Sequence, residues 1–427
     1  MVKANLKTEA VAGVTTFFTM AYIVIVNPQI LSADGKTGMA FSGVLTATVL
    51  ICFTMTLLMG LYAKLPFAVA PGMGINAFFT YTIVLGKGVP WPTALGAVFW
   101  AGVLFLIISI TPIRESIAKA IPAELRIAAA AGIGVFLTFI GLKNAGFIVA
   151  DPVTLVKLGS LGKPALFAIL GVAIAAFLMA RKSAFAFLAS IAIVTLAAWA
   201  FGMVNRPPKL LTLPDFQSVF LKLDIFGALK LSLLPAIIAI MFTDLFDSIS
   251  TFIGVAHAGD LLDKDGHPKN LRQGLIVDSF ATFGAGLAGT SSGTAYIESI
   301  AGIRMGGRTG MTAVFTALCF LPCFFIAPLA GMVPPFATAA VLIMVGAAMF
   351  TSIGKINFSK IEEGVPAFLT LILIPLTFSI TQGILWGFIS HVGLYLMAGR
   401  RRDIHPVMYA LAVVSIGLLL LERVRFS

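Results

Sequence analysis

GTSSGTAYIESIAGIRMGGR, residues 289–308, carries one glutamate, Glu298, in a chain that is otherwise strongly apolar. Gly, Ser and Thr crowd the first half of this stretch, where a membrane-spanning helix should run without interruption. A second stretch, FAVAPGMGINAFF at residues 67–79, is broken in the same way by glycine and proline. Backbone groups that such breaks free at membrane depth need partners inside the protein. These two interruptions therefore predict that the chain folds around an interior polar region.

The two broken segments predict a binding site. Two half-helices whose N-termini meet near the middle of the bilayer point unpaired N–H donors at a solute. The alternative is a pair of short helices that pack tightly through glycine. We favour the binding site because both breaks coincide with polar clusters at corresponding places in the two halves of the chain.

The composition predicts a polytopic membrane protein. Of the 427 residues, 59% are hydrophobic and 11% are charged, whereas a soluble domain carries about 25% charged residues. Apolar runs recur along the whole length, which indicates one integral unit surrounded by membrane lipid. The net charge of +11 comes from basic residues between these runs, so they indicate loops rather than a nucleic-acid-binding surface.

The sequence predicts neither a cofactor nor a metal site. Cys52, Cys319 and Cys323 all lie inside apolar runs, with no second cluster of ligands nearby, and are expected to be small buried thiols. The N-terminus lacks the apolar core and cleavage site of a signal peptide, so we expect the first helix to direct insertion.

Apolar runs predict fourteen membrane segments, because a spanning helix needs about 20 apolar residues. They are placed at residues 10–30, 41–62, 73–86, 91–110, 124–142, 164–180, 184–204, 232–257, 271–287, 297–303, 309–330, 335–352, 364–380 and 382–398. The third and tenth are too short to span. An apolar tail at 406–421 is either an interfacial helix or an extra span. Seven segments per half is an odd number, which predicts two halves of opposite orientation, an inverted repeat.

The distribution of Lys and Arg predicts the orientation. With the N-terminus on the cytoplasmic side, the inner loops hold about twice as many basic residues as the outer loops. We therefore expect a multi-pass protein of the cell inner (plasma) membrane with a cytoplasmic N-terminus.

The eighth segment carries acids and hydroxyls at helical spacing. In MFTDLFDSISTFIGVAHAG, residues 241–259, Asp244, Asp247, Ser248 and Thr251 recur at i, i+3, i+4 and i+7. That spacing places them on one helix face, which we expect to point into the protein interior. A carboxylate at membrane depth is a candidate functional group, so at least one of the two acids is predicted to line the site.

The tenth segment is expected to hold its glutamate at the start of a helix. Ser291, Ser292 and Thr294 are candidate caps, and Glu298 would then lie in the first turn, where the helix dipole favours an acid. Asn76 occupies the corresponding place in the third segment and, being neutral, both donates and accepts hydrogen bonds.

Three further polar residues lie at membrane depth. Asp278 has no polar stripe around it, and we expect it to make a structural hydrogen bond. Asn27 precedes Pro28, so it either ends a helix or contributes to the site. His391 is a lone histidine that is expected to be packed rather than to relay protons.

These motifs resemble the purine permeases of the nucleobase transporter superfamily that also contains xanthine and uracil permeases, and in particular the guanine/hypoxanthine/adenine branch. TTFFTMAYIVIVNPQIL, APGMGINAFF, FTDLFDSISTFIGVA and TSSGTAYIESIAGIRMGGRTG carry the resemblance, which covers nearly the whole chain. It implies an all-α polytopic fold with a 7+7 inverted repeat and short strands before helices 3 and 10. It also implies core domains at 1–122 and 231–332, and gate domains at 123–230 and 333–427, the last with a C-terminal tail.

The resemblance also implies roles for individual residues. A helix-eight acid and a helix-ten glutamate hold the base in relatives, and these match Asp244 and Glu298. The Y-x-E pattern reads Tyr296-Ile297-Glu298 here. Ser248, a candidate for binding the base, stands where the uracil branch has a histidine, so Asp247 joins Asp244 and Glu298 as a candidate for proton coupling. Such permeases are usually proton symporters and often homodimers.

Hydrogen-bonding chemistry suggests how a purine would bind. Glu298 and Asp244 would accept from N–H groups of the base, while Asn76 and the backbone at Gly74 and Ile297 would answer its acceptors. Tyr296 or Phe78 would stack on the ring.

Other functions remain open to different degrees. The sequence does not rank guanine, hypoxanthine and adenine, and xanthine, uracil or sodium coupling are alternatives on the same fold. Three acids disfavour an anion as the substrate. A membrane aspartyl protease would need a Gly-x-Gly-Asp motif, which is missing from the sequence, and two mirrored broken helices disfavour a channel. We therefore expect a transporter and not an enzyme.

Overall fold

The structure is a computed structural model that describes residues 5–111, 120–262 and 268–423. The first four residues, which we placed in the cytoplasm, lie outside the described residues. So do parts of two loops predicted on the same side, at 112–119 and 263–267.

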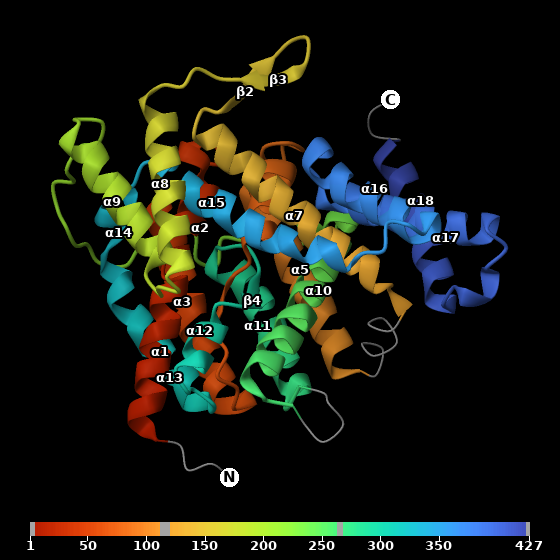
Figure 1. Ribbon diagram of the computed structural model, residues 1–427, viewed down its shortest axis with the longest axis horizontal. Helices are drawn as coiled ribbons and strands as arrows, with labels where there is room; N and C mark the ends of the chain where they lie inside the picture. Colours follow the sequence, from red (N-terminus) through yellow and green to blue (C-terminus); the bar gives the residue numbers. More distant parts are fainter. Residues whose placement is uncertain (1–4, 112–119, 263–267, 424–427) are drawn as a thin grey trace.

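The described chain is mostly helical (Figure 1). Its α-helices are α1 (Leu6–Met20), α2 (Ile23–Ser32), α3 (Phe41–Leu58), α4 (Met73–Ala77), α5 (Trp91–Ile110), α7 (Ala123–Asn144), α8 (Lys163–Ala180), α9 (Ala186–Ala200), α10 (Leu234–Gly259), α11 (Leu271–Ala288), α12 (Ser299–Arg304), α13 (Gly310–Phe320), α14 (Ala327–Gly331), α15 (Pro335–Phe350), α16 (Ile361–Thr377), α17 (Ile380–Met397) and α18 (Pro406–Arg423). Eight helical segments among the described residues are long and apolar enough to cross a membrane. The polytopic helical fold is thus confirmed, while fourteen segments remain a prediction.

Several predicted helices differ from the observed ones. The first divides into α1 and α2, where i to i+3 hydrogen bonds tighten the turn at Ala21 and Tyr22. The third is α4 followed by a π-helical turn at Phe78–Val84. The eleventh stops at Phe320, and a 3-10 turn containing Pro322 leads to α14, because proline cannot continue the hydrogen-bond ladder. The tail at 406–421 forms α18, which packs against α17.

Two short, buried strands pair in the interior of the molecule. β1 (Val69–Pro71) precedes α4, β4 (Gly293–Ala295) precedes α12, and the two pair antiparallel with Ala70 opposite Thr294. Both strands are completely buried and are packed between α3, α10 and α11. The predicted strands before the third and tenth helices are therefore present.

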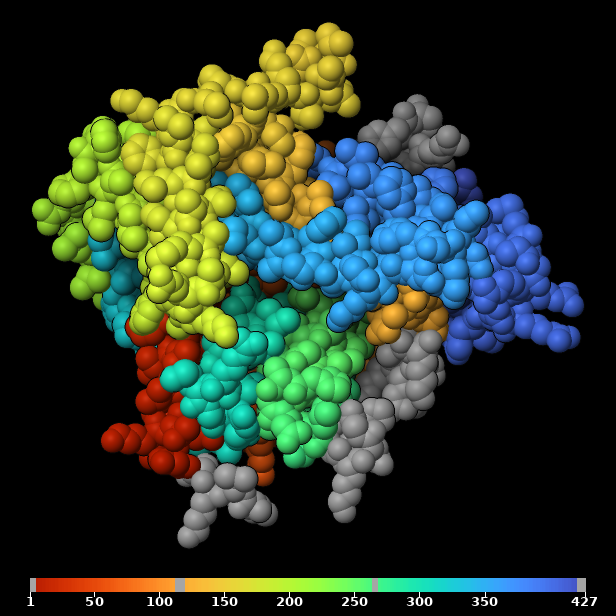
Figure 2. Space-filling model, viewed as in Figure 1, coloured from red at the N-terminus to blue at the C-terminus, as the bar shows by residue number. Residues whose placement is uncertain are grey.

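A hairpin that the sequence did not predict connects α7 to α8. β2 (Ile148–Asp151) and β3 (Leu155–Leu158) pair antiparallel and are mostly exposed. The hairpin projects from the body of the molecule as a narrow arm (Figure 2).

The helices pack in two sets of neighbours. In one set α7 packs against α15 and α16, and α8 packs against α9 and α15. In the other, α1 packs against α13, α11 packs against α3 and α5, and α10 packs against α5. The α7–α15 crossing is close because a Cβ atom on Gly346 would lie 2.3 Å from the carbonyl oxygen of Gly134.

Candidate functional site

The strand pair is the scaffold of the candidate site. The Tyr296 N–H donates to the Ala68 carbonyl at 2.9 Å, which extends the pairing beyond β4. The hydroxyl of Thr56 on α3 accepts from the Val69 N–H at 2.9 Å, and that of Ser299 on α12 accepts from the Ala68 N–H at 3.0 Å. These bonds fix the places at which the chain leaves the strands and enters α4 and α12.

A carboxyl–hydroxyl cluster lies against β4. Asp244 of α10 and Asp278 of α11 are both fully buried. The Thr282 hydroxyl contacts Oδ2 of Asp244, and the Ser248 hydroxyl contacts Oδ2 of Asp278. Thr282 also lies 3.0 Å from the Gly293 carbonyl oxygen, so the cluster is joined directly to the strand.

Glu298 lies between the end of β4 and the start of α12. It occupies the N-cap position of α12, and its Oε1 accepts a hydrogen bond of 2.8 Å from the Tyr22 hydroxyl. Tyr22 is 1% exposed and sits at the tight turn between α1 and α2. Its ring also contacts that of Phe187 on α9, with 5.0 Å between the ring centres.

Two buried amides flank the strands. The Ser291 hydroxyl bonds to Oδ1 of Asn76 in α4. Nδ2 of Asn27 donates to the hydroxyls of Thr48 and Thr290, at 2.7 and 2.8 Å. Asn27 therefore ties α2 to α3 and to the segment before β4, which is more than the end of a helix.

Several buried polar atoms around the strand pair have no hydrogen-bond partner among the described residues. They are Oδ1 of Asp244, Oδ1 of Asp278, Oδ1 of Asn27, Nδ2 of Asn76 and the hydroxyls of Ser292 and Thr243. Native proteins leave few such atoms unpaired, and each one calls for an explanation. Both acceptors and a donor are present, so the cluster is equipped to bind protons, water or a small polar solute.

A cavity lies beside the strand pair, between α10 and α7. Its walls are the turn from β1 into α4, one face of α7, one face of α10 and part of α15. Asp247, Thr243 and Ser250 line it from α10, and Arg126 lines it from α7. The cavity thus contains an acid and a base on helices from the two packing sets.

The structure divides the predicted polar stripe of α10. Asp244 and Ser248 face α11 and β4, whereas Asp247 faces the cavity. Residues three apart on a helix differ by about 60° around the axis, so one broad face can border two environments. Thr251 is buried, like Asp244 and Ser248.

The predicted capping of the tenth helix is wrong. Thr294 belongs to β4, and its hydroxyl lies 3.2 Å from that of Ser248. Ser291 bonds to Asn76, and the start of α12 has no side-chain cap. The hydroxyls are used across the strand pair because α12 starts only at Ser299, too far along the chain for them to cap it.

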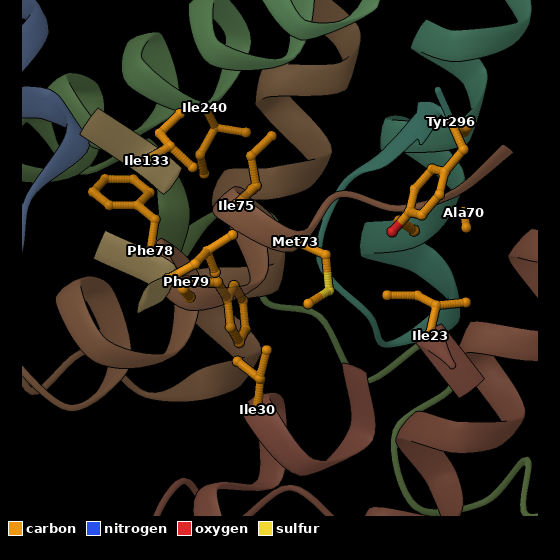
Figure 3. Packing of buried hydrophobic residues seen from close by; sticks show 14 of the residues in the cluster. Ile23, Ile30, Ala70, Met73, Ile75, Phe78, Phe79, Ile133, Ile240 and Tyr296 are labelled. Carbon is orange, nitrogen blue, oxygen red and sulfur yellow. The ribbon is translucent and has the colours of Figure 1, made fainter. Parts of the chain in front are cut away.

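The remaining predicted contacts lie around the strands in different environments. Gly74 lines the cavity and packs so closely that a Cβ atom would lie 2.3 Å from Cγ2 of Ile133. The Ile297 side chain is 55% exposed. Phe78 lies on the Ile133 side of Met73 and Tyr296 lies on the other side, so the two rings do not face each other (Figure 3). The Tyr296 hydroxyl donates to the Pro71 carbonyl at 2.5 Å.

Sequence reasoning missed three residues of this region. Tyr22 donates a hydrogen bond to Glu298, and Arg126 brings a cation into the cavity. Thr282 is the partner of Asp244. None of the three carried a signal in the sequence, since a basic residue near the cytoplasmic start of an apolar helix, such as Arg126, is what the positive-inside rule expects. Asp278 makes the predicted hydrogen bond, and His391 is packed against Tyr395. Among the described residues, no group of three or more His, Cys, Asp or Glu side chains is placed to hold a metal ion.

A solved structure has the same fold. The transmembrane domain of a cyanobacterium bicarbonate transporter, BicA, matches with a TM-score of 0.67 and 17% identity, covering 91% of this chain and 98% of that chain. At this identity the match shows the fold alone, which is that of a helical polytopic membrane transporter. Residues 7–385 match the model described as the Permease family. The chain belongs to this family.

Relatives of known name match along almost the whole length. The chain is 44% identical to the adenine permease AdeP of Escherichia coli, covering 96% of this chain and 92% of AdeP. It is 38% identical to the guanine/hypoxanthine permease PbuO of Bacillus subtilis, covering 96% of each chain. The resemblance to the purine permease branch is confirmed, and the chain is a transporter rather than an enzyme.

Proposed function

We propose that this protein imports purine nucleobases by proton symport with alternating access. The observation that carries the proposal is the set of unpaired polar atoms around the β1–β4 pair, which offers both donors and acceptors to a small solute. A purine presents N–H donors and ring acceptors around one flat ring. Relatives named as adenine and guanine/hypoxanthine permeases support this choice of solute.

The architecture proposed for this function is a 7+7 inverted repeat of fourteen segments. The core domains comprise residues 1–122 and 231–332, and the gate domains comprise residues 123–230 and 333–427. The position of β1 and β4 before α4 and α12 supports the repeat. The protein would lie in the cell inner membrane, with a cytoplasmic N-terminus, and form a homodimer.

The acids would bind the donor groups of the base. Glu298, held by Tyr22, would accept from a purine N–H, and Asp244 or Asp247 would accept from a second. The free Nδ2 of Asn76 would donate to a ring acceptor. A buried polar group left unpaired costs about 1–3 kcal/mol, which is enough to discriminate between bases.

Hydrogen-bond counting supports a proton at the carboxyl cluster. The Thr282 hydroxyl lies within bonding distance of both Asp244 and the Gly293 carbonyl, yet it carries one hydrogen. A protonated Asp244 would donate to Thr282 and free that hydrogen for Gly293. Loss of this proton would leave a buried charge that no described cation pairs, an unfavourable state that would drive rearrangement.

Uptake of radiolabelled purines by purine-transport-deficient cells tests the proposal. We expect adenine, guanine or hypoxanthine to accumulate and to be displaced by unlabelled purines more strongly than by uracil or xanthine. A protonophore should abolish the accumulation, whereas replacement of sodium should leave it unchanged. Preferred uptake of uracil or xanthine, or dependence on sodium, would establish one of the alternatives instead.

Glu298→Gln provides the matched variant, because it keeps the size of the side chain and the bond from Tyr22. At equal expression we expect uptake to fall by about tenfold to hundredfold, because the substitution removes a hydrogen bond between the base and a charged group. Uptake at the wild-type level would refute the role of Glu298.

A further inference from the structure

Arg126 is a cation in the candidate cavity whose guanidinium group forms no hydrogen bond or ion pair with the described residues. It lies on α7, where it lines the cavity together with Ala129, Ala130 and Ile133 at helical spacing. Its Nε atom is buried and has no hydrogen-bond partner among the described residues. A buried guanidinium nitrogen without an acceptor is costly, so its position calls for an explanation.

Asp247 faces the same cavity from the opposite wall. It lies on α10, and no described residue forms a hydrogen bond or ion pair with its carboxyl group. Thr243 and Ser250 line the cavity from α10 together with Asp247, while Arg126 lines it from α7. The cavity therefore presents donors on one side and acceptors on the other.

This arrangement matches the two kinds of edge on a purine. The N7 atom is an acceptor in adenine, guanine and hypoxanthine, and the adjacent O6 of the two oxopurines is a second acceptor. A guanidinium group presents paired N–H donors in a fixed plane and binds that edge well, whereas a carboxylate binds N–H donors of the base.

We propose that Arg126 is a specificity-determining residue that donates to N7 of the transported purine while Asp247 accepts from an N–H of the same base. The inference rests on the proposed function and adds a ligand from α7 to a site otherwise built by α4, α10 and β4. A base held in this way bridges the two sets of packed helices. The O6 atom gives oxopurines a second bond to Arg126, so guanine and hypoxanthine gain more from this residue than adenine does.

The test is a binding cycle in which the protein and the base are each changed at one place. Purified protein is titrated with adenine, guanine and hypoxanthine, and with their 7-deaza analogues, in which C–H replaces N7. The variants are Arg126→Gln, Arg126→Lys and, as a matched control, Arg272→Gln, whose guanidinium lies outside the cavity and bonds to the Ile110 carbonyl.

The wild-type protein and the Arg272→Gln variant should bind each parent base about tenfold more tightly than its 7-deaza analogue, the value of one hydrogen bond to a charged donor. Arg126→Gln should lose this preference, and Arg126→Lys should retain part of it. The two substitutions at position 126 leave the proposal testable even where one of them folds poorly.

A preference for N7 that survives in Arg126→Gln would overturn the proposal, as would a wild-type protein that does not distinguish the analogues. If Arg126→Gln keeps the wild-type ratio of affinities for parent base and 7-deaza analogue but transports more slowly, the proposal is overturned. Arg126 then only pairs with Asp247 when the cavity closes. A wild-type protein that binds none of the purines would overturn the proposed function itself, so the two failures can be told apart.

Discussion

Asp244 and Asp247 are the same residue type one turn apart on α10, yet they lie in two different regions. Asp244 is enclosed, with Thr282 on one oxygen and no partner on the other. Asp247 borders a cavity and faces a helix of the other packing set, which contributes Arg126. The difference shows that membrane depth and residue type do not define the role of an acid. Two acids that point about 60° apart around one helix lie in a packed cluster and beside a cavity, respectively.

Each region predicts a different response to mutation. Asp244 is bonded to the scaffold, so its replacement should affect both stability and transport. Asp247 makes no hydrogen bond with the described residues, so its replacement should affect transport alone. Measurements that report on stability and transport separately can therefore tell the two regions apart.

Asp247→Asn should have the largest effect on transport relative to stability. We expect uptake to fall by about tenfold to hundredfold, because the base loses a charged partner. The thermal unfolding temperature in detergent should stay the same. Labelled-purine uptake and a melting curve of the purified protein measure the two quantities. A large fall in the unfolding temperature would place Asp247 in the scaffold and contradict the division of the helix.

Thr282→Val should mainly reduce stability. It removes the contacts with Asp244 and Gly293 while preserving the shape of the side chain, and we expect a cost of about 1–3 kcal/mol in the free energy of unfolding. Thr54→Val is the matched control, because the Thr54 hydroxyl bonds only to the Leu50 carbonyl in its own helix. Equal losses in the two variants would show that the cluster contributes nothing beyond an ordinary helix threonine.

Tyr22→Phe should have a smaller effect, mainly on substrate affinity. The substitution removes the bond to Glu298 and keeps the ring contact with Phe187. The loss of one hydrogen bond, about 0.5–1.5 kcal/mol, corresponds to a KM roughly two to twelve times higher. Tyr395→Phe, on α17, serves as the control. An unchanged KM in Tyr22→Phe would show that Glu298 needs no support from α1 and α2.

The exposed hairpin of β2 and β3 lies outside both regions of α10, so changes in it should affect transport least. Backbone N–H groups of Thr154 and Val153, together with Lys157, lower the pKa of Asp151 to about 2. Because the pKa is lowered in the folded hairpin, the stabilisation is present at neutral pH and is lost as pH falls from about 4 towards 2. The hydrogen-exchange protection factors of residues 148–158 should therefore be equal at pH 7 and pH 5.

Asp151→Asn should accelerate exchange within the hairpin at pH 7 and leave purine uptake at the wild-type level. A loss of uptake in this variant would mean that the hairpin takes part in transport, and the two regions of α10 would then not account for the activity alone.

The sequence predicted the arrangement of helices better than the contacts between them. The span at 91–110 agrees with α5 to the residue, because its apolar run is bounded by Pro90 and Thr111. The two breaks before α4 and α12 were also predictable, since glycine, proline and serine interrupt apolar runs there. The hairpin was missed because its strands are short, exposed and without an alternating pattern.

The details of the site depended on contacts between distant parts of the chain. Tyr22 and Glu298 are 276 positions apart, and Tyr22 lies in an apolar run where nothing marks it as polar in function. The separation of Asp244 from Asp247 was likewise hidden, because helical spacing places both on one broad face. Only the packing of α11 and α7 on either side reveals that they border different environments.

Purine uptake by proteoliposomes that contain only this protein, driven by an imposed proton gradient in sodium-free buffer, tests both the transport site and the coupling ion. We predict that labelled purine accumulates in the wild-type vesicles with a matching influx of protons, and that both fluxes are lost together in Asp247→Asn. Unchanged coupled transport in Asp247→Asn would contradict the claim that the cavity beside the strand pair is the transport site, and accumulation without proton influx would contradict proton symport.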